Sequence, residues 1–366
     1  MRLSTTLSFY MGRHFLLAFL GLISLFLLLI FTFDIVELLR RAAARPHITI
    51  DLVIEMALLK LPNMAVRTFP FAILFGGMAA FWRLSRTHEL VVTRAAGVSA
   101  WQFLFPVLLS AILLGIFQVA LLGPFASSSL SRFERLETRL MEGKESSLAI
   151  SSSGLWLRQA TDEGQAVVHA RHVLQQGDDV ELWKIIIFRY QGADSFASRI
   201  EADYGRLEEG YWYLKDVRTY IPDHLAEDED EFWLKTDLTI TRIQDSFAPP
   251  ETLSFWSLPG FIATLEEAGF SAVRHRLHFH VQLASPLLLC AMVLLAAAFT
   301  LKTSSRGGAT YVILAGVMTG FMVHFTSDIV FALGLSDSIP VVLAAWSPSV
   351  VATLLGVAML LHLEDG

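Results

Sequence analysis

The chain has 366 residues, of which 54% are hydrophobic, and its mean hydropathy is +0.53. Average proteins have about 45–50% apolar residues even with glycine counted, so this composition excludes an ordinary soluble globular protein. The formal charge of −7 is distributed unevenly, because residues 125–275 hold 15 basic and 26 acidic residues whereas the rest holds 13 and 9. Two environments are therefore expected: a membrane for the flanks and water for the acidic middle.

Several apolar runs reach the length of about 20 residues that crosses the hydrocarbon core of a bilayer. They cover residues 15–33, 57–82, 101–123, 277–301, 310–335 and 340–363. The first run exceeds the roughly 7–15 apolar residues of a signal peptide and has no small-residue cleavage site after it, so we interpret it as a retained span. The single cysteine, Cys290, lies within the fourth run, and a disulfide framework is not expected.

The second span is interrupted in its first half by Pro62, Asn63, Arg67 and Pro70. Lys60 and Arg67 are spaced so that they share one face of a helix. Ionisable side chains at this depth usually face a bundle interior or an aqueous cavity, although Lys60 alone could extend to the lipid headgroups.

A polar island, residues 82–101, separates the second and third spans. Its charged residues give a net charge of +2: Arg83, Arg86 and Arg94 against Glu89. Glu89, Leu90, Val92 and Thr93 precede Gly97 at helical spacing, which predicts a short amphipathic helix near 84–97 on the membrane surface. This helix could dock a soluble partner, or the island could be an ordinary basic loop.

Three net-positive segments, residues 1–14, 83–97 and 302–308, fall on one side if all six runs cross the membrane. The positive-inside rule makes that side cytoplasmic. The expected fold is therefore an α-helical membrane bundle of six transmembrane helices, with both termini cytoplasmic. Residues 1–124 and 276–366 form the bundle, and residues 125–275 form an inserted domain on the outer side.

The inserted domain begins with a polar helical stretch, residues 125–145, whose Arg132, Arg135 and Arg139 form a basic stripe or an ordinary solvated face. Beyond residue 147, short runs of alternating aromatic or β-branched and polar residues recur between turn signals. The runs begin at Gly154, Ala166, Leu182, Ser198, Tyr211 and Phe232. This pattern predicts an all-β antiparallel sandwich or jelly-roll-like sheet. The acidic run 227–231 is interpreted as a solvated loop, and residues 151–153 as a turn.

No motif for nucleotide hydrolysis, nucleophilic catalysis or zinc-dependent proteolysis occurs in the sequence. We therefore expect a non-catalytic chain that binds no ATP, magnesium or other cofactor itself. His275, His278 and His280 are spaced around a helix and do not suggest a metal site. His324 and Asp328 share one face and could meet, as a functional pair or as a simple hydrogen-bonded pair.

Basic residues gather at the outer ends of the spans: Arg40, Arg41, Lys60, Arg67, Arg132 and Arg135. Guanidinium groups suit bidentate recognition of phosphate. Charge at headgroup level beside an apolar cavity is the arrangement needed to hold a phosphorylated lipid of the outer leaflet.

Several segments resemble the LptF/LptG family of lipopolysaccharide export permeases, in order and over nearly the whole length. The most specific is Arg86-Thr-His-Glu-Leu-Val-Val-Thr-Arg-Ala-Ala-Gly-Val-Ser after the second span. Leu253-Ser-Phe-Trp-Ser-Leu, Pro286, Arg306 and Ile339-Pro-Val-Val-Leu-Ala-Ala-Trp-Ser-Pro-Ser fit the family's second half.

The resemblance implies a permease subunit of an ATP-driven ABC transporter that extracts lipopolysaccharide from the outer leaflet of the inner membrane. It implies pairing with the permease LptF, a dimer of the ATPase LptB that holds ATP and magnesium, and LptC. It also implies a periplasmic β-domain that passes the lipid to a jelly-roll bridge, with no role for nucleic acid.

The resemblance also implies residue roles. A coupling helix docks on the ATPase through an acidic residue, which is Glu89 here, with Leu90 and Arg94 in the same helix. Arg40 and Arg41 match a basic pair that meets the lipid, and Glu37 matches its acidic neighbour.

The sequence departs from the family at Asp34 and Asn63, where relatives can have basic residues. Lipid contacts could be redistributed here to Lys60 or Arg67. Two other functions stay open: a mechanotransmission permease that moves no lipid, and a membrane-bound lipid-modifying enzyme.

Overall fold

The computed structural model describes residues 5–43, 49–95, 97–138, 148–151, 154–161, 164–176, 179–191, 195–208, 210–222, 225–236, 248–267, 269–302 and 308–365. The chain forms two compact units. A helical unit comprises Met1–Met141, Glu251–Trp256 and Arg276–Gly366, and a β unit comprises Glu142–Pro250 and Ser257–His275.

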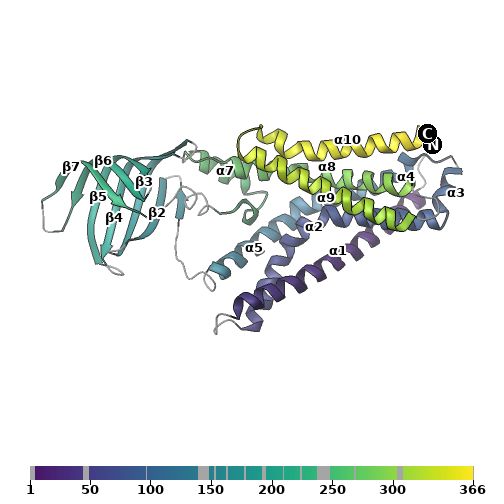
Figure 1. Cartoon of the computed structure of the whole chain (residues 1–366), viewed down its shortest axis with the longest axis horizontal. Helices are drawn as coiled ribbons and strands as arrows, with labels where there is room; N and C mark the ends of the chain where they lie inside the picture. The colour runs from purple at the N-terminus through teal and green to yellow at the C-terminus, as the bar shows by residue number, and fades with distance from the viewer. Residues whose placement is uncertain are drawn as a thin grey trace. The chain divides into compact units, whose positions relative to one another are not determined.

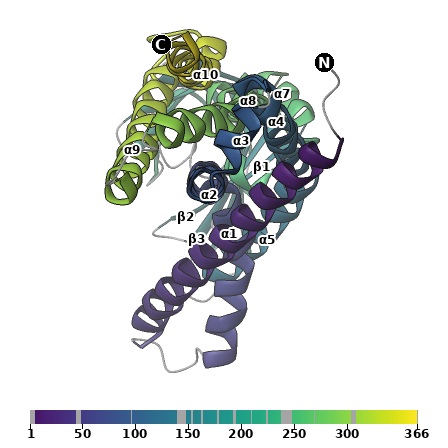
Figure 2. The ribbon, with the colours of Figure 1, turned by 90° about the vertical axis from the view of Figure 1, so that its right-hand side faces the viewer.

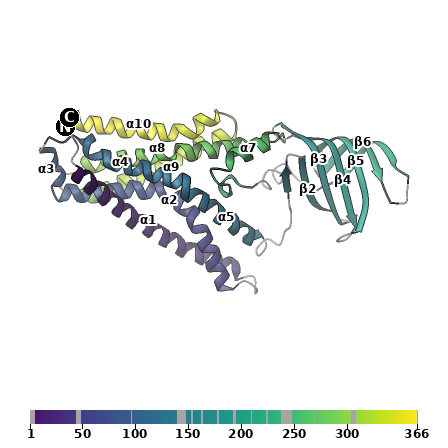
Figure 3. The ribbon, with the colours of Figure 1, turned by 180° about the vertical axis from the view of Figure 1, so that it is seen from behind.

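Within the described ranges, six helices are long and apolar enough to cross a membrane, which confirms the predicted bundle. They are α1 (Thr5–Ala42), α2 (Ile50–Arg86), α4 (Ala100–Phe117) with its continuation, α8 (Val273–Lys302), α9 (Gly308–Leu335) and α10 (Val341–Asp365). A π-helical turn, η1 (Gln118–Leu122), joins α4 to α5 (Gly123–Glu137) without a break, as Figure 3 shows. The beginning of α1, the short helix α3 (Glu89–Ala95) and the end of α10 lie at one end of the helical unit (Figure 1).

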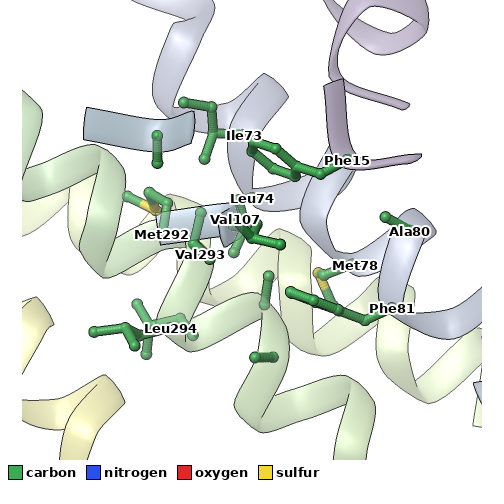
Figure 4. Packing of buried hydrophobic residues seen from close by; sticks show 14 of the residues in the cluster. Phe15, Ile73, Leu74, Met78, Ala80, Phe81, Val107, Met292, Val293 and Leu294 are labelled. Carbon is green, nitrogen blue, oxygen red and sulfur yellow. The ribbon is translucent and has the colours of Figure 1, made fainter. Parts of the chain in front are cut away.

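The main core of the helical unit joins α1, α2, α4 and α8. Phe15, Ile73, Phe81, Val107 and Val293 are almost completely buried in it (Figure 4). Close packing between membrane helices depends on small residues where the backbones approach. Gly115 of α4 is such a position, because a Cβ there would lie 2.6 Å from the Cα of Pro286 in α8.

A second apolar cluster ties α1, α2 and α5 together at the opposite end of these helices from α3. Its buried members include Leu38, Val53, Met56, Leu130 and Phe133. Burial of a large apolar side chain stabilises by about 1.5–3 kcal/mol, so this cluster fixes the charged residues that surround it.

The β unit is an antiparallel sheet with seven described strands. They are β1 (Leu148–Ser151), β2 (Gly154–Thr161), β3 (Gly164–Gln176), β4 (Asp179–Gln191), β5 (Ser195–Glu208), β6 (Tyr211–Tyr220) and β7 (Glu227–Lys235). Each strand pairs with its neighbour in sequence, so the predicted all-β domain is confirmed and its topology is a meander (Figure 1). Alternate residues of the strands are buried together with two residues that come after the sheet in the chain. Leu265 lies in α7 (Leu258–Glu267), and Phe270 follows this helix.

Ser151, in the predicted turn, ends β1 and pairs with Gly154 at the start of β2, and residues 152 and 153 lie outside the described residues. One local prediction about this domain was wrong: the acidic run 227–231 is part of β7 and not a loop. Its charges are compensated across the strand pair, because Arg218 donates to both Asp228 oxygens at 2.6 and 3.0 Å. Tyr213 likewise donates to Glu231 at 2.6 Å, and such cross-strand partners stabilise a pairing that charge alone disfavours.

The pairing of β7 should weaken in acid. Hydrogen bonding from Arg218 holds the pKa of the Asp228 carboxyl below its ordinary value of 3.8. Because the folded-state pKa is depressed, the pair stabilises β7 above the ordinary pKa, and the stabilisation is lost as pH falls through the folded value. Hydrogen exchange of β7, normalised to the central strand β4, should therefore accelerate below pH of about 4 by roughly two- to fivefold, as expected for an exposed ion pair. The variant Arg218→Gln should show the faster exchange already at neutral pH, and an unchanged β7 in that variant would contradict the assignment.

Candidate functional site

An apolar groove runs over α2 between α1 and α9, and Figure 2 shows α2 between the other two helices. Its volume is ≈ 500 Å³. Three helices contribute the lining: Phe26, Leu29, Ile30 and Phe33 from α1, Thr68, Phe71 and Phe75 from α2, and Val317, Phe321 and His324 from α9. With only one hydroxyl and one imidazole in this lining, the groove suits hydrocarbon chains.

A cluster of charges begins where the apolar lining of α1 ends. Asp34 directly follows Phe33 and accepts a hydrogen bond from Lys60 Nζ of α2 at 2.8 Å. One turn further along α1, Glu37 accepts hydrogen bonds from Arg40 at 2.9 Å and from Arg41 at 2.8 Å. We call these five charged residues, Asp34, Glu37, Arg40, Arg41 and Lys60, the rim cluster.

Helix α5 adds further charges beside the rim cluster. Glu137 accepts from Arg41 at 3.3 Å, and Arg132 donates to Glu55 of α2 at 2.9 Å. Arg135 donates to the hydroxyl of Ser131 at 2.6 Å. The structure thus brings Arg40, Arg41, Lys60, Arg132 and Arg135 to one end of α1, α2 and α5, whereas Arg139 lies outside the described residues.

The basic residues of this group are largely balanced by carboxylates. The arginine pairs are well exposed, and an exposed ion pair contributes only about 0–1 kcal/mol. The pair between Lys60 and Asp34 is more enclosed, with 29% and 19% of the side chains exposed. An anion that enters the rim can therefore replace a carboxylate at an arginine with little loss.

A second cavity, which we call the inner cavity, lies between α2, η1, α8, α9 and α10, with a volume of ≈ 300 Å³. Arg67 lines this cavity and does not join the rim cluster. Pro70 on the same helix has no backbone N–H, so the carbonyl of Val66 lacks its usual helical donor. Gln118 replaces that donor through its Nε2, at 3.2 Å from the Val66 oxygen, at the residue where the π-helical turn begins.

A short helix lies within the predicted range 84–97 as α3, Glu89–Ala95, whereas residues 84–86 are the end of α2. Helix α3 ends before Gly97, whose φ of 83° permits the left-handed conformation, and Val98 N–H donates to the Thr93 carbonyl at 3.3 Å. This pattern is a Schellman motif. Glu89 begins the helix, accepts a hydrogen bond from Thr87 Oγ1 at 2.8 Å and interacts with Tyr10 of α1.

The outer surface of α3 carries an apolar side chain, because Val92 is 67% exposed. The backbones of Leu90 and Arg94 are in the helix, whereas their side chains lie outside the described residues. Arg86, at the end of α2, stacks over Trp82 with 5.2 Å between the guanidinium carbon and the ring centre.

The histidines make local contacts. His275 is hydrogen-bonded to the Ala248 carbonyl at 3.1 Å, and His278 to Gln282 at 2.8 Å. His324 and Asp328 do meet, with 3.5 Å between Nε2 and the carboxylate. In the part of the chain that the structure describes, no three His, Cys, Asp or Glu side chains are placed to hold a metal ion.

The six apolar helices and the inserted β-sheet together define a multi-pass membrane protein. The sequence matches the model of the family "Lipopolysaccharide export system permease LptF/LptG" over residues 9–362. The chain belongs to this family, and it is therefore an inner-membrane permease of lipopolysaccharide export. No curated protein matches the sequence significantly.

Sequence reasoning missed the groove residues of α9 and the role of Gln118. The groove aromatics look like ordinary lipid-facing residues of apolar runs, and only the packing of α1 and α9 against α2 distinguishes them. For Gln118 a signal did exist, since a proline inside a span creates a free carbonyl that a polar residue on another helix can satisfy.

The hydrogen bond from Gln118 should stabilise the helical unit only because Pro70 is present. Gln118→Leu leaves the Val66 carbonyl without a donor, which should cost about 1–3 kcal/mol. In a Pro70→Ala background the new backbone N–H can serve that carbonyl, so the same substitution should cost clearly less. The unfolding midpoints in detergent of the native protein, the two single variants and the double variant measure how strongly the effects of the two substitutions on stability are coupled. Equal losses in the two backgrounds would show that Gln118 acts by another route.

Proposed function

We propose that this chain is the LptG-type subunit of an ATP-driven ABC transporter, and that its groove forms half of the cavity that receives lipopolysaccharide. The observation that carries the proposal is the sequence of surfaces along α1: apolar up to Phe33 and charged from Asp34 onward. An amphiphile with hydrocarbon chains and a phosphorylated headgroup has the same two parts in the same order.

The rim cluster supplies the headgroup contacts in this proposal. A phosphate can accept two parallel hydrogen bonds from one guanidinium, as a carboxylate does. Arg40 now gives such a pair of hydrogen bonds to Glu37, at 2.9 Å each. Lipid binding then exchanges one anionic partner for another, while Glu37 retains Arg41.

The groove is open along one side, and we propose that a second permease, LptF, closes it. The exposed apolar residues of α1 and α9, such as Leu25, Leu28, Val317 and Phe321, would face the partner or the lipid chains. A single subunit would therefore be incomplete, and LptC would join the pair as the further partner that the family resemblance implies.

Energy for the cycle would come from outside this chain. ATP and magnesium would be held by a dimer of the ATPase LptB, and α3 would dock on it through Glu89, Leu90 and Arg94. The net positive charge of residues 82–101 supports a cytoplasmic position for α3 and for both termini. The β unit would then be periplasmic and would pass the lipid to a bridge of similar domains.

Headgroup binding can be tested at the rim. Arg40→Glu combined with Arg41→Glu should lower photocrosslinking of lipopolysaccharide to a probe at Phe33 by about tenfold, because two charge-assisted contacts become repulsive. The matched control, Arg40→Lys with Arg41→Lys, retains the charges but loses the bidentate geometry, so its crosslinking should lie between that of the native protein and that of the glutamate variant. Equal crosslinking by the two double variants would exclude the rim as the headgroup site.

The coupling role of Glu89 can be tested against a control substitution at Thr87, which hydrogen-bonds to Glu89. Glu89→Ala should leave the assembled complex in the membrane while lowering ATP-dependent release of lipopolysaccharide from vesicles by about tenfold or more, the effect of removing a charged contact at an interface. Thr87→Val removes the hydroxyl contacts to Glu89 and to the Arg83 and Leu84 carbonyls but keeps the carboxylate, and should release lipid normally. If Thr87→Val is as damaging as Glu89→Ala, the carboxylate acts within the chain and not on the ATPase.

A further inference from the structure

Helices α2 and α9 run antiparallel, in a register that two contacts define. A Cβ at Gly316 of α9 would lie 2.5 Å from the sulfur of Met78 in α2, so the helices touch at this level. Two turns further along α9, the ring of His324 meets the ring of Phe71 edge to face, with 5.7 Å between their centres. Both helices rise by the same amount per residue, so a step along α9 matches an equal step along α2 in the opposite direction.

Arg67 and Asp328 stand one turn beyond the contact between Phe71 and His324, on the same side of it. Each is four residues from the ring of its own helix, and residues four apart share one helix face. Both residues line the inner cavity. The register therefore brings a guanidinium from α2 and a carboxylate from α9 to the same level of one space.

These charges lie at a depth where a charge needs a partner. Arg67 precedes Trp82, where the polar island begins, by 15 residues, which is about 22 Å of helix and less than the hydrocarbon thickness of about 30 Å. Ionisable side chains inside a membrane usually pair with one another. Among the residues that the structure describes, Arg67 forms no ion pair, and Asp328 pairs only with His324 of its own helix, at 3.5 Å.

The inner cavity, with a volume of ≈ 300 Å³, separates the two groups. Of the two helices, α9 is held more loosely, because 11% of its apolar stretch is buried within the chain, against 56% for α2. A movement that brings the charges together is therefore a movement of α9, with the contact at Gly316 as its pivot.

We propose that Arg67 and Asp328 form an ion pair between α2 and α9 in a second conformation, and that this pair positions α9. Asp328 then exchanges His324 for the guanidinium, which suits a carboxylate with two parallel hydrogen bonds, and α9 closes the inner cavity. Because Val317 and Phe321 of α9 also line the lipid groove, the same movement changes the width of the groove. This consequence rests on the proposed function of the groove, whereas the ion pair itself does not.

Distances between two spin labels in the assembled complex test the ion pair. The labels are attached after Leu58→Cys in α2 and Leu335→Cys in α9, both exposed positions, with Cys290→Ala and no cysteine in the other chains. The complex with its native charges should show two distances. Arg67→Gln or Asp328→Asn should lower the share of the shorter distance by about tenfold, the effect of losing a charged hydrogen bond. A single distance in the native complex, or an unchanged share in either variant, would overturn the proposal.

Two further substitutions separate the ion pair from a general loss of stability. His324→Phe keeps a ring against Phe71 but removes the present partner of Asp328, so the share of the shorter distance should rise. Arg67→Asp places two carboxylates at one level and should abolish the shorter distance, whereas adding Asp328→Arg should restore it. A lower share in His324→Phe, or no recovery when the charges are exchanged, would refute the ion pair.

Lys60→Gln is the matched control, because it removes the ion pair that joins α2 to Asp34 of α1 and leaves α9 untouched. The share of the shorter distance should not change in this variant. If Lys60→Gln lowers it as much as Arg67→Gln does, the rim cluster positions α9 and the proposal fails. These measurements require no lipopolysaccharide, so a groove that binds no lipid would leave them unaffected.

Discussion

The helical unit depends on one constraint: in hydrocarbon, a polar group without a partner costs several kcal/mol, so the protein must supply the partner. Pro70 illustrates both the problem and its solution. It frees the Val66 carbonyl, and Gln118 on another helix supplies the donor from a π-helical turn.

The charged groups of the rim cluster also have partners within the protein, but these partners are held in ion pairs that another anion can exchange. Its arginines are paired with carboxylates near the surface, where a pair contributes only about 0–1 kcal/mol. A transporter must release what it binds, and an unpaired basic cluster would hold a polyphosphorylated lipid too firmly. Carboxylates that compete for the same guanidinium groups lower the net gain of binding. In the proposed cycle, Glu37 between Arg40 and Arg41 would therefore be as relevant as the arginines themselves.

What the sequence predicted well has a local signal, and what it missed depends on distant partners. Apolar length identified the spans, and period-two alternation identified six of the strands. The end of α3 was marked by Gly97. The first part of β7, residues 227–231, was missed because its pairing is supported by Arg218 on the preceding strand, which local charge counting ignores. Likewise, the basic residues were predicted as a set, but their pairing with Asp34, Glu37 and Glu55 depends on how α1, α2 and α5 pack.

Helix α1 offers a direct physical route between the two ends of the proposed cycle. It is one continuous helix of 38 residues, about 57 Å long at 1.5 Å per residue. Tyr10 near its beginning interacts with Glu89 of α3, its middle lines the groove through Phe26 and Phe33, and its end carries Arg40. A helix is stiff along its axis, so a displacement of α3 by an ATPase would reach the groove and the rim together. Narrowing the groove while moving the rim arginines would weaken chain and headgroup contacts in one step, which is what expelling an amphiphile requires.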